Sequence, residues 1–161
     1  MDVTTGKRLA GSFSEYSSSA GSYRGELLGL CAINVILLAL TKSGNITNRP
    51  PMTIWCDNKG ALNRAANGGR RIKSRLSCAD ILRVLRSIRM ELPLNVTCCH
   101  VKAHMDEYLP WDELPLENQL NCQCDHLAKA AIHRAIDSHL DNVPPRTTRL
   151  PKESAAIFID G

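Results

Sequence analysis

Apolar residues recur at helical spacing in three segments of the chain. The first segment begins at Ser22, a residue suited to capping a helix, and runs to about Leu40. In the second segment the apolar stripe consists of Ile81, Val84, Leu85 and Ile88. The third segment starts near Asn118 and includes Leu127, Ala128, Ala131 and Ala135. The spacing predicts three amphipathic helices, and a shorter helix is expected to end near Ala66.

Shorter apolar runs between these segments predict strands. Met52–Asp57 and Leu94–Val101 are rich in strand-forming residues and suit buried strands. Residues 8–16 alternate loosely after a Thr-Thr-Gly-Lys turn and suit a strand that leaves a hairpin. Strands that alternate with helices favour an α/β layer fold with a partly parallel sheet.

Composition favours one domain followed by a tail. The 161 residues are 43% hydrophobic, which is enough for one core. A linker rich in Pro, Arg and Thr over Val143–Pro151 precedes a strand-like end. We therefore expect a domain over residues 1–139, and a linker with a C-terminal strand-like segment over residues 140–161.

The cysteine count and the hydropathy pattern both bear on location. The longest apolar run, Leu27 to Leu40, is interrupted by Asn34 and is shorter than the roughly 20 residues of a membrane span, so a buried helix and no membrane contact are expected. No secretory leader pattern opens the chain. Seven cysteines without disulfide-scaffold spacing fit reduced thiols, which predicts an intracellular protein, cytoplasmic or nuclear.

The net charge of +4 is modest, but the positive charge is concentrated. Between Arg64 and Arg89 the single acid is Asp80, and a local basic stretch of this kind is typical of a surface that faces phosphates. A solvated helix face is the alternative interpretation. The basic residues of the stretch are Arg64, Arg70, Arg71, Lys73, Arg75, Arg83, Arg86 and Arg89.

Three acids stand in informative surroundings. Glu26 follows Ser-Tyr-Arg-Gly near a helix start, Asp57 ends a strand in Trp-Cys-Asp-Asn, and Asp125 lies in Asn-Cys-Gln-Cys-Asp-His-Leu-Ala, after Val-Lys-Ala-His104. In order and approximate spacing these strings resemble the motifs of the ribonuclease H family, and most closely those of retroelement reverse transcriptases. The resemblance extends from residue 8 to about residue 135 and implies a ribonuclease H-like mixed sheet flanked by helices.

The resemblance also implies a chemistry. Glu26, Asp57 and Asp125 would be catalytic and would bind two Mg²⁺ or Mn²⁺ ions, which such an enzyme uses to hydrolyse the RNA strand of an RNA/DNA hybrid. His104 would assist proton transfer or product release as a fourth catalytic residue. Further domains of a reverse transcriptase polyprotein are expected as partners. Nucleic-acid contacts are expected from Asn58, Arg70, Arg71, Lys73, Arg75 and Asn121.

The chain departs from the family pattern at its start. The family opens with a strand that ends in Asp-Gly-Ser and supplies another metal ligand, and Asp2 is a poor substitute for that aspartate. One interpretation is an N-terminal truncation. The other is a circular permutation, in which the strand-like end of the chain supplies Asp160, because the extended linker could reach about 45 Å. Unless Asp160 supplies this ligand, loss of the aspartate is expected to impair activity.

Two other functional interpretations remain open at this stage. A catalytically inactive nucleic-acid-binding module of a retroelement protein would keep the basic stretch without efficient hydrolysis. A zinc site is the second, although the spacing of its candidate ligands is poor for zinc. The long acidic loop over residues 105–117 could cover the substrate or repel it. The candidate zinc ligands are Cys98, Cys99, His100, His104, Cys122 and Cys124.

Overall fold

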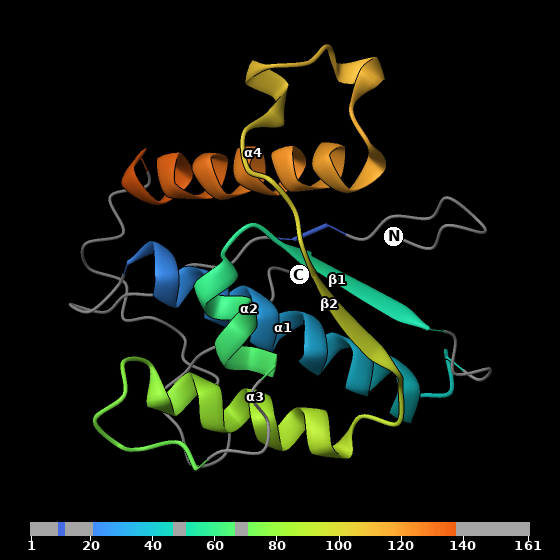
Figure 1. Cartoon of the computed structure of the whole chain (residues 1–161), viewed down its shortest axis with the longest axis vertical. Coiled ribbons are helices and arrows are strands. Elements are labelled where there is room, and N and C mark those ends of the chain that lie inside the picture. Colours follow the sequence, from blue (N-terminus) through green and yellow to red (C-terminus); the bar gives the residue numbers. More distant parts are fainter. Residues whose placement is uncertain (1–9, 12–20, 47–50, 67–70, 138–161) are drawn as a thin grey trace.

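The computed structural model describes residues 10–11, 21–46, 51–66 and 71–137 (Figure 1). Over these residues the chain is mixed α/β, with the predicted alternation of helices and strands. The predicted strand over residues 8–16 and the segment 140–161 lie outside the described residues, apart from Ala10 and Gly11. The elements are α1 (Ser22–Lys42), β1 (Met52–Cys56), α2 (Lys59–Ala66), α3 (Ala79–Glu91), β2 (Val96–His100) and α4 (Leu116–Asp137).

β1 and β2 form a parallel pair, in register from Met52 opposite Val96 to Cys56 opposite His100. Parallel strands end at the same edge of a sheet, so the residues that follow both strands lie close together there. The expectation that β1 is a buried strand is correct for one face only. Ile54 and Cys56 are buried, whereas Trp55 on the opposite face is 43% exposed.

The core lies between the strands and α1, α2 and α3. α1 and α3 run beneath the strands while α4 lies above them (Figure 1). Leu27 of α1 and Ile81 and Leu85 of α3 are essentially inaccessible to solvent. By length and composition alone α1 could cross a membrane, but its buried face packs against α3 and the sheet, as the apolar stripe predicted.

Two ion pairs align α1 and α3 in parallel. Arg24 and Asp80, both near the starts of their helices, form a two-pronged pair with N–O distances of 3.2 and 2.9 Å. Lys42 and Glu91, near the ends of the same helices, lie 3.3 Å apart and are exposed. The first pair is mostly buried, with side-chain exposures of 11% for Arg24 and 28% for Asp80. Asp80, the single acid of the basic stretch, therefore has a structural role.

We expect Asp80→Asn to lower the free energy of unfolding by about 1–2 kcal/mol at pH 7, because a fork-shaped, charge-assisted pair is lost. Hydrogen bonds from Arg24 lower the pKa of Asp80. A lowered pKa means that the contribution is complete above the unfolded-state value of about 3.9 and disappears as the pH falls through the folded-state value. Urea unfolding at several pH values should therefore show the difference between Asp80→Asn and wild type shrinking in acid.

The matched control for this prediction is Glu91→Gln. It breaks the exposed pair at the other end of the same two helices, and such pairs contribute less than about 1 kcal/mol. Equal losses for the two variants, or a loss for Asp80→Asn that persists unchanged at low pH, would contradict the assigned role of Asp80.

One detail of the predicted elements is wrong. Ser22 does not cap α1; Gly21 occupies the cap position without a side-chain hydrogen bond, and Ser22 is the first helical residue. The acidic loop over residues 105–117 contains two 3₁₀ turns, Met105–Glu107 and Trp111–Glu113. Buried Asn118, at the start of α4, donates to the carbonyl of Lys102 at 3.0 Å. This bond fixes α4 against the segment that leaves β2.

Candidate metal centre

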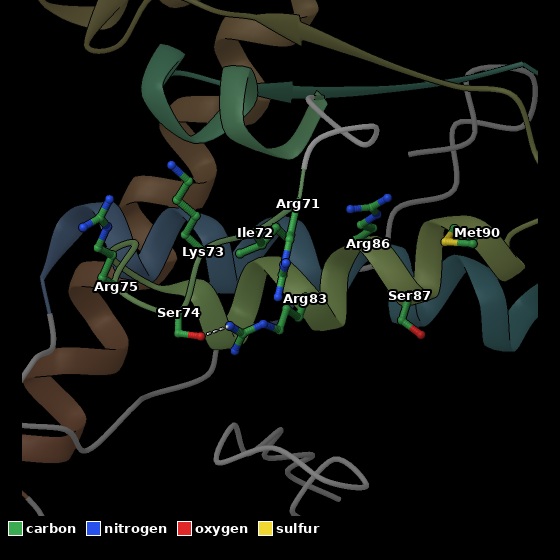
Figure 2. A pocket seen from close by; sticks show the side chains of 9 residues that line it. All are labelled: Arg71, Ile72, Lys73, Ser74, Arg75, Arg83, Arg86, Ser87 and Met90. Carbon is green, nitrogen blue, oxygen red and sulfur yellow. Dashed lines mark hydrogen bonds between the residues drawn. The ribbon is translucent and has the colours of Figure 1, made fainter.

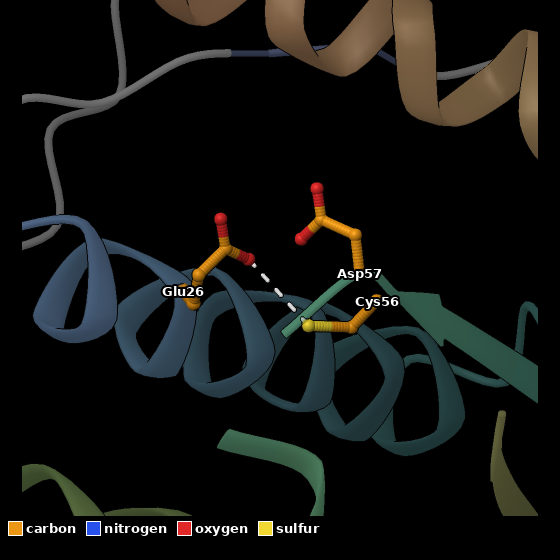
Figure 3. A group of neighbouring side chains, drawn as sticks. All are labelled: Glu26, Cys56 and Asp57. Atoms are coloured by element: carbon orange, nitrogen blue, oxygen red, sulfur yellow. Dashed lines mark hydrogen bonds between the residues drawn. The ribbon is translucent and has the colours of Figure 1, made fainter. Parts of the chain in front are cut away.

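Glu26 and Asp57 meet at the carboxyl end of β1 (Figure 3). Glu26 comes from the second turn of α1, one residue before the fully buried Leu27, and Asp57 is the first residue after β1. Cys56 lies between them, and one ligand atom from each of the three residues falls within 4.8 Å of the others. Packing of α1 against the sheet therefore brings together two carboxylates that are distant in the sequence.

Asp57 is held from two directions. The side-chain amide of Asn121, from α4, donates to Oδ2 of Asp57 at 3.5 Å. Nε2 of His100, at the end of β2, lies 3.1 Å from the backbone carbonyl oxygen of Asp57, to which it can donate. These contacts connect β1, β2 and α4 at the site, and they show that Asn121, predicted to contact nucleic acid, also holds Asp57.

Asp125 and His104 form the α4 side of the site. Nδ1 of His104 lies 3.7 Å from Oδ2 of Asp125. His104 has a left-handed backbone with φ of 52°, unusual for a residue with a side chain, and directly precedes the first 3₁₀ turn. The negative charge of Asp125 acts on Glu26 across the site. Asp125 and His104 therefore lie on the α4 side of the site, and they are not part of the group whose ligand atoms all fall within 4.8 Å of one another.

The carboxylates repel one another. Burial raises the pKa of Glu26, and the neighbouring charge of Asp57 raises it further. Burial raises the pKa of Asp125, again with a contribution from Asp57, while His104 acts in the opposite direction. Like charges that approach in a partly buried place favour a proton or a cation between them. A divalent ion would relieve the repulsion, so the donor set fits the hard, oxygen-preferring Mg²⁺ ion.

Cys56 also belongs to the site, although the family motifs assign it no role. The residue is 6% exposed, and its thiol donates to Oε2 of Glu26 at 3.5 Å. Burial raises the pKa of Cys56 to about 12. Strand alternation carried part of the signal, because a residue two positions after Ile54 lies on the same face of the strand.

A basic groove lies on α3 and the loop before it (Figure 2). Its volume is about 890 Å³, and no acid lines it. Three of the predicted nucleic-acid contacts, Arg71, Lys73 and Arg75, line this groove, whereas Arg70 lies outside the described residues. The remaining lining residues are Ile72, Ser74, Arg83, Arg86, Ser87 and Met90.

Two residues of the predicted nucleic-acid surface have structural partners instead. Oδ1 of Asn58 accepts from the backbone N–H of Ala61 at 3.0 Å, so this side chain caps α2. The guanidinium of Arg89 donates to the carbonyls of Ala65 and Val96 at 3.3 and 3.4 Å. The amide group of Asn58 lies beside the site, but its carbonyl oxygen is already used.

The structure does not gather the six candidate zinc ligands. Among the described residues, the group close enough to share an ion is Glu26, Cys56 and Asp57, and it contains none of the six. Cys98 packs against the core, and Cys122 donates instead to Asp106 at 3.2 Å. Asp2 and Asp160, the candidates for the absent first aspartate, lie outside the described residues.

Comparison with known proteins returns no match. No family model matches the chain, and neither a curated protein nor a solved structure matches it.

Proposed function

We propose that the chain is a ribonuclease H-type domain that hydrolyses the RNA strand of RNA/DNA hybrids with divalent metal ions. The observation that carries the proposal is the meeting of Glu26 and Asp57 at the end of β1, with Asp125 near enough for its charge to act on Glu26. The motifs that resemble those of the ribonuclease H family contain the same three residues. An intracellular location within a retroelement reverse transcriptase belongs to the same proposal.

Glu26, Asp57 and Asp125 would hold two Mg²⁺ or Mn²⁺ ions. When bound there, such ions activate a water molecule and stabilise the leaving oxygen of a phosphodiester. The protein holds the three carboxylates in position despite their mutual repulsion. Asn121 and His100 do this for Asp57, and the core packing of Leu27 does it for Glu26.

His104 is suited to moving a proton at the edge of the site. Its imidazole is more than half exposed, so it can exchange protons with water, and its Nδ1 lies 3.7 Å from Oδ2 of Asp125. A histidine in this place can give a proton to a departing oxygen and recover it from solvent. The left-handed backbone at His104 is consistent with a side chain held in a functional direction.

The basic groove supports a nucleic-acid substrate. α1 and α3 are parallel, so Glu26 and the loop before α3 lie at the same end of the molecule (Figure 1). A duplex whose scissile phosphate reaches the carboxylates can therefore extend toward Arg71, Lys73 and Arg75. Hybrid recognition depends mainly on shape and phosphate contacts, which flexible basic side chains provide.

A second candidate function is a binding module without activity. The basic groove favours it, because the groove does not depend on the carboxylates and would bind phosphates without them. The two candidates differ in one measurement, the cleavage of a labelled RNA/DNA hybrid in Mg²⁺ and in chelator. Metal-dependent cleavage by the chain supports the hydrolase, whereas tight binding without cleavage under both conditions supports the binding module.

Neutralising the groove should weaken hybrid binding in a salt-dependent way. For Arg71→Gln with Arg75→Gln, the slope of log K against log salt should fall by about 2, because each lost phosphate contact releases about one counterion fewer. Fluorescence anisotropy with a labelled hybrid in Ca²⁺ measures this slope. Lys42→Gln is the control, since it removes a positive charge at the far end of α1. An unchanged slope in the double variant would remove the groove from the binding surface.

A further inference from the structure

Cys56 gives the carboxylate site a donor of a different chemical kind. The strand directs the thiol of Cys56 toward Glu26 of α1 (Figure 3). Trp55, the preceding residue, lies on the opposite, exposed face of the strand. Sγ lies 3.5 Å from Oε2 of Glu26, and it belongs to the group whose ligand atoms fall within 4.8 Å of one another. One oxygen from each of two carboxylates and one sulfur therefore surround a position suited to a single ion.

The surroundings of this sulfur differ from those of a cysteine that merely fills the core. Cys31, also buried in the core, illustrates the ordinary case: burial alone raises the pKa of its thiol. Sγ of Cys56 instead contacts a carboxylate and also accepts from the backbone N–H of Asn58 at 3.4 Å. Hydrogen bonds from backbone N–H groups to sulfur also accompany metal-bound sulfurs.

The donor set decides which ions the site accepts. Mg²⁺ is a hard cation that takes oxygen ligands in preference to sulfur. Zn²⁺ accepts thiolate and carboxylate together, usually with four ligands, and soft thiolate donors favour ions of this class over Mg²⁺. One thiolate and two carboxylates would supply three of the four positions, and water can take the fourth.

We propose that Glu26, Cys56 and Asp57 bind a thiophilic divalent ion such as Zn²⁺ or Cd²⁺, with Cys56 as the residue that determines this specificity. On binding, the S–H bond of Cys56 breaks, a sulfur–metal bond forms and the proton leaves to solvent. The ion competes with Mg²⁺ for both carboxylates. The proposal rests on the proposed function only in requiring that this end of the sheet binds a divalent ion.

Cd²⁺ is the probe, because thiolate coordination gives it an ultraviolet charge-transfer band. The full chain is titrated with Cd²⁺ alongside Cys56→Ser, Asp57→Asn and Cys31→Ser. The tightest site should show the band of one thiolate and should be lost in the first two variants, with affinity falling by about 100-fold or more. Cys31→Ser should keep it. A first equivalent with the same band in Cys56→Ser overturns the proposal.

A measurement on the wild-type chain covers the case in which Cys56→Ser fails to fold. The ¹¹³Cd chemical shift distinguishes a site with one sulfur and several oxygens from an all-oxygen site or a site of several cysteines. Either of the latter two results overturns the proposal. Hybrid cleavage by the wild-type chain in Mg²⁺ is assayed separately, so that a mixed-ligand Cd²⁺ site without cleavage contradicts only the hydrolase. Cleavage with an all-oxygen Cd²⁺ site contradicts only the role of Cys56.

Discussion

Asp57→Asn is expected to lower kcat/KM for Mg²⁺-dependent cleavage of an RNA/DNA hybrid by about 1,000-fold, or roughly 4 kcal/mol of transition-state stabilisation. Asp57 is central to the site, since its charge acts on both Glu26 and Asp125. An amide oxygen in its place keeps the shape and the contact from Asn121 but binds a divalent ion weakly. Single-turnover cleavage of a labelled hybrid measures the loss.

The same variant should not lose stability, and this separates a metal ligand from a structural acid. The charge of Asp57 raises the pKa of Glu26 and of Asp125 in the folded chain. Groups with raised pKa values destabilise the fold as the pH rises through those values, so removal of Asp57 relieves a cost at neutral pH. In chelator, the melting temperature of Asp57→Asn should therefore equal or exceed that of the wild type. Substitutions in strained functional sites often stabilise a protein in this way.

Glu91→Gln is the control for both measurements, because it removes one negative charge at the far end of α1 and α3. It should leave cleavage unchanged. Cleavage that survives Asp57→Asn within tenfold would exclude the proposed site. A loss of activity that accompanies an equal loss of folded protein would instead give Asp57 a structural role.

Periodicity predicted the elements well, because each helix carries an apolar stripe that has one place to pack. The predicted stripe of Ile81, Leu85 and their neighbours is the stripe that α3 buries against α1. Local pattern could not show that β1 is covered on one side only, since burial of Trp55 depends on which segments lie over the sheet. It also placed a capping role on Ser22, although the chain enters α1 through extended Gly21.

The site was predictable to the extent that motifs mark its residues. Glu26, Asp57, Asp125 and His104 were identified by neighbouring residues, and packing brings them to one end of the sheet. The capping of α2 by Asn58 depends on hydrogen-bond geometry that a motif does not contain. The contact between Cys56 and Glu26 is of the same kind, since it joins two elements 30 residues apart.

Leu27→Ala is expected to lower the free energy of unfolding by about 3–4 kcal/mol, the usual cost of a cavity at a fully buried leucine. The midpoint of urea unfolding should fall by roughly 1–2 M with an unchanged slope. The effect should reach the metal site as well, because Leu27 is adjacent to Glu26 and fixes the turn of α1 that presents the carboxylate. Metal affinity measured below the unfolding transition should therefore fall along with stability.

Ile36→Ala is the matched control on the same helix. Ile36 is 42% exposed, so its truncation removes little buried surface and should cost less than about 1 kcal/mol. Because Leu27 and Ile36 are both large and aliphatic, hydropathy alone does not distinguish them, and a helix embedded in an apolar medium would treat them alike. Similar losses for the two variants would contradict the orientation of α1 described above. A large loss for Leu27→Ala alone would establish that the orientation of α1 is set by packing on α3 and the sheet, which is also what places Glu26 beside Asp57.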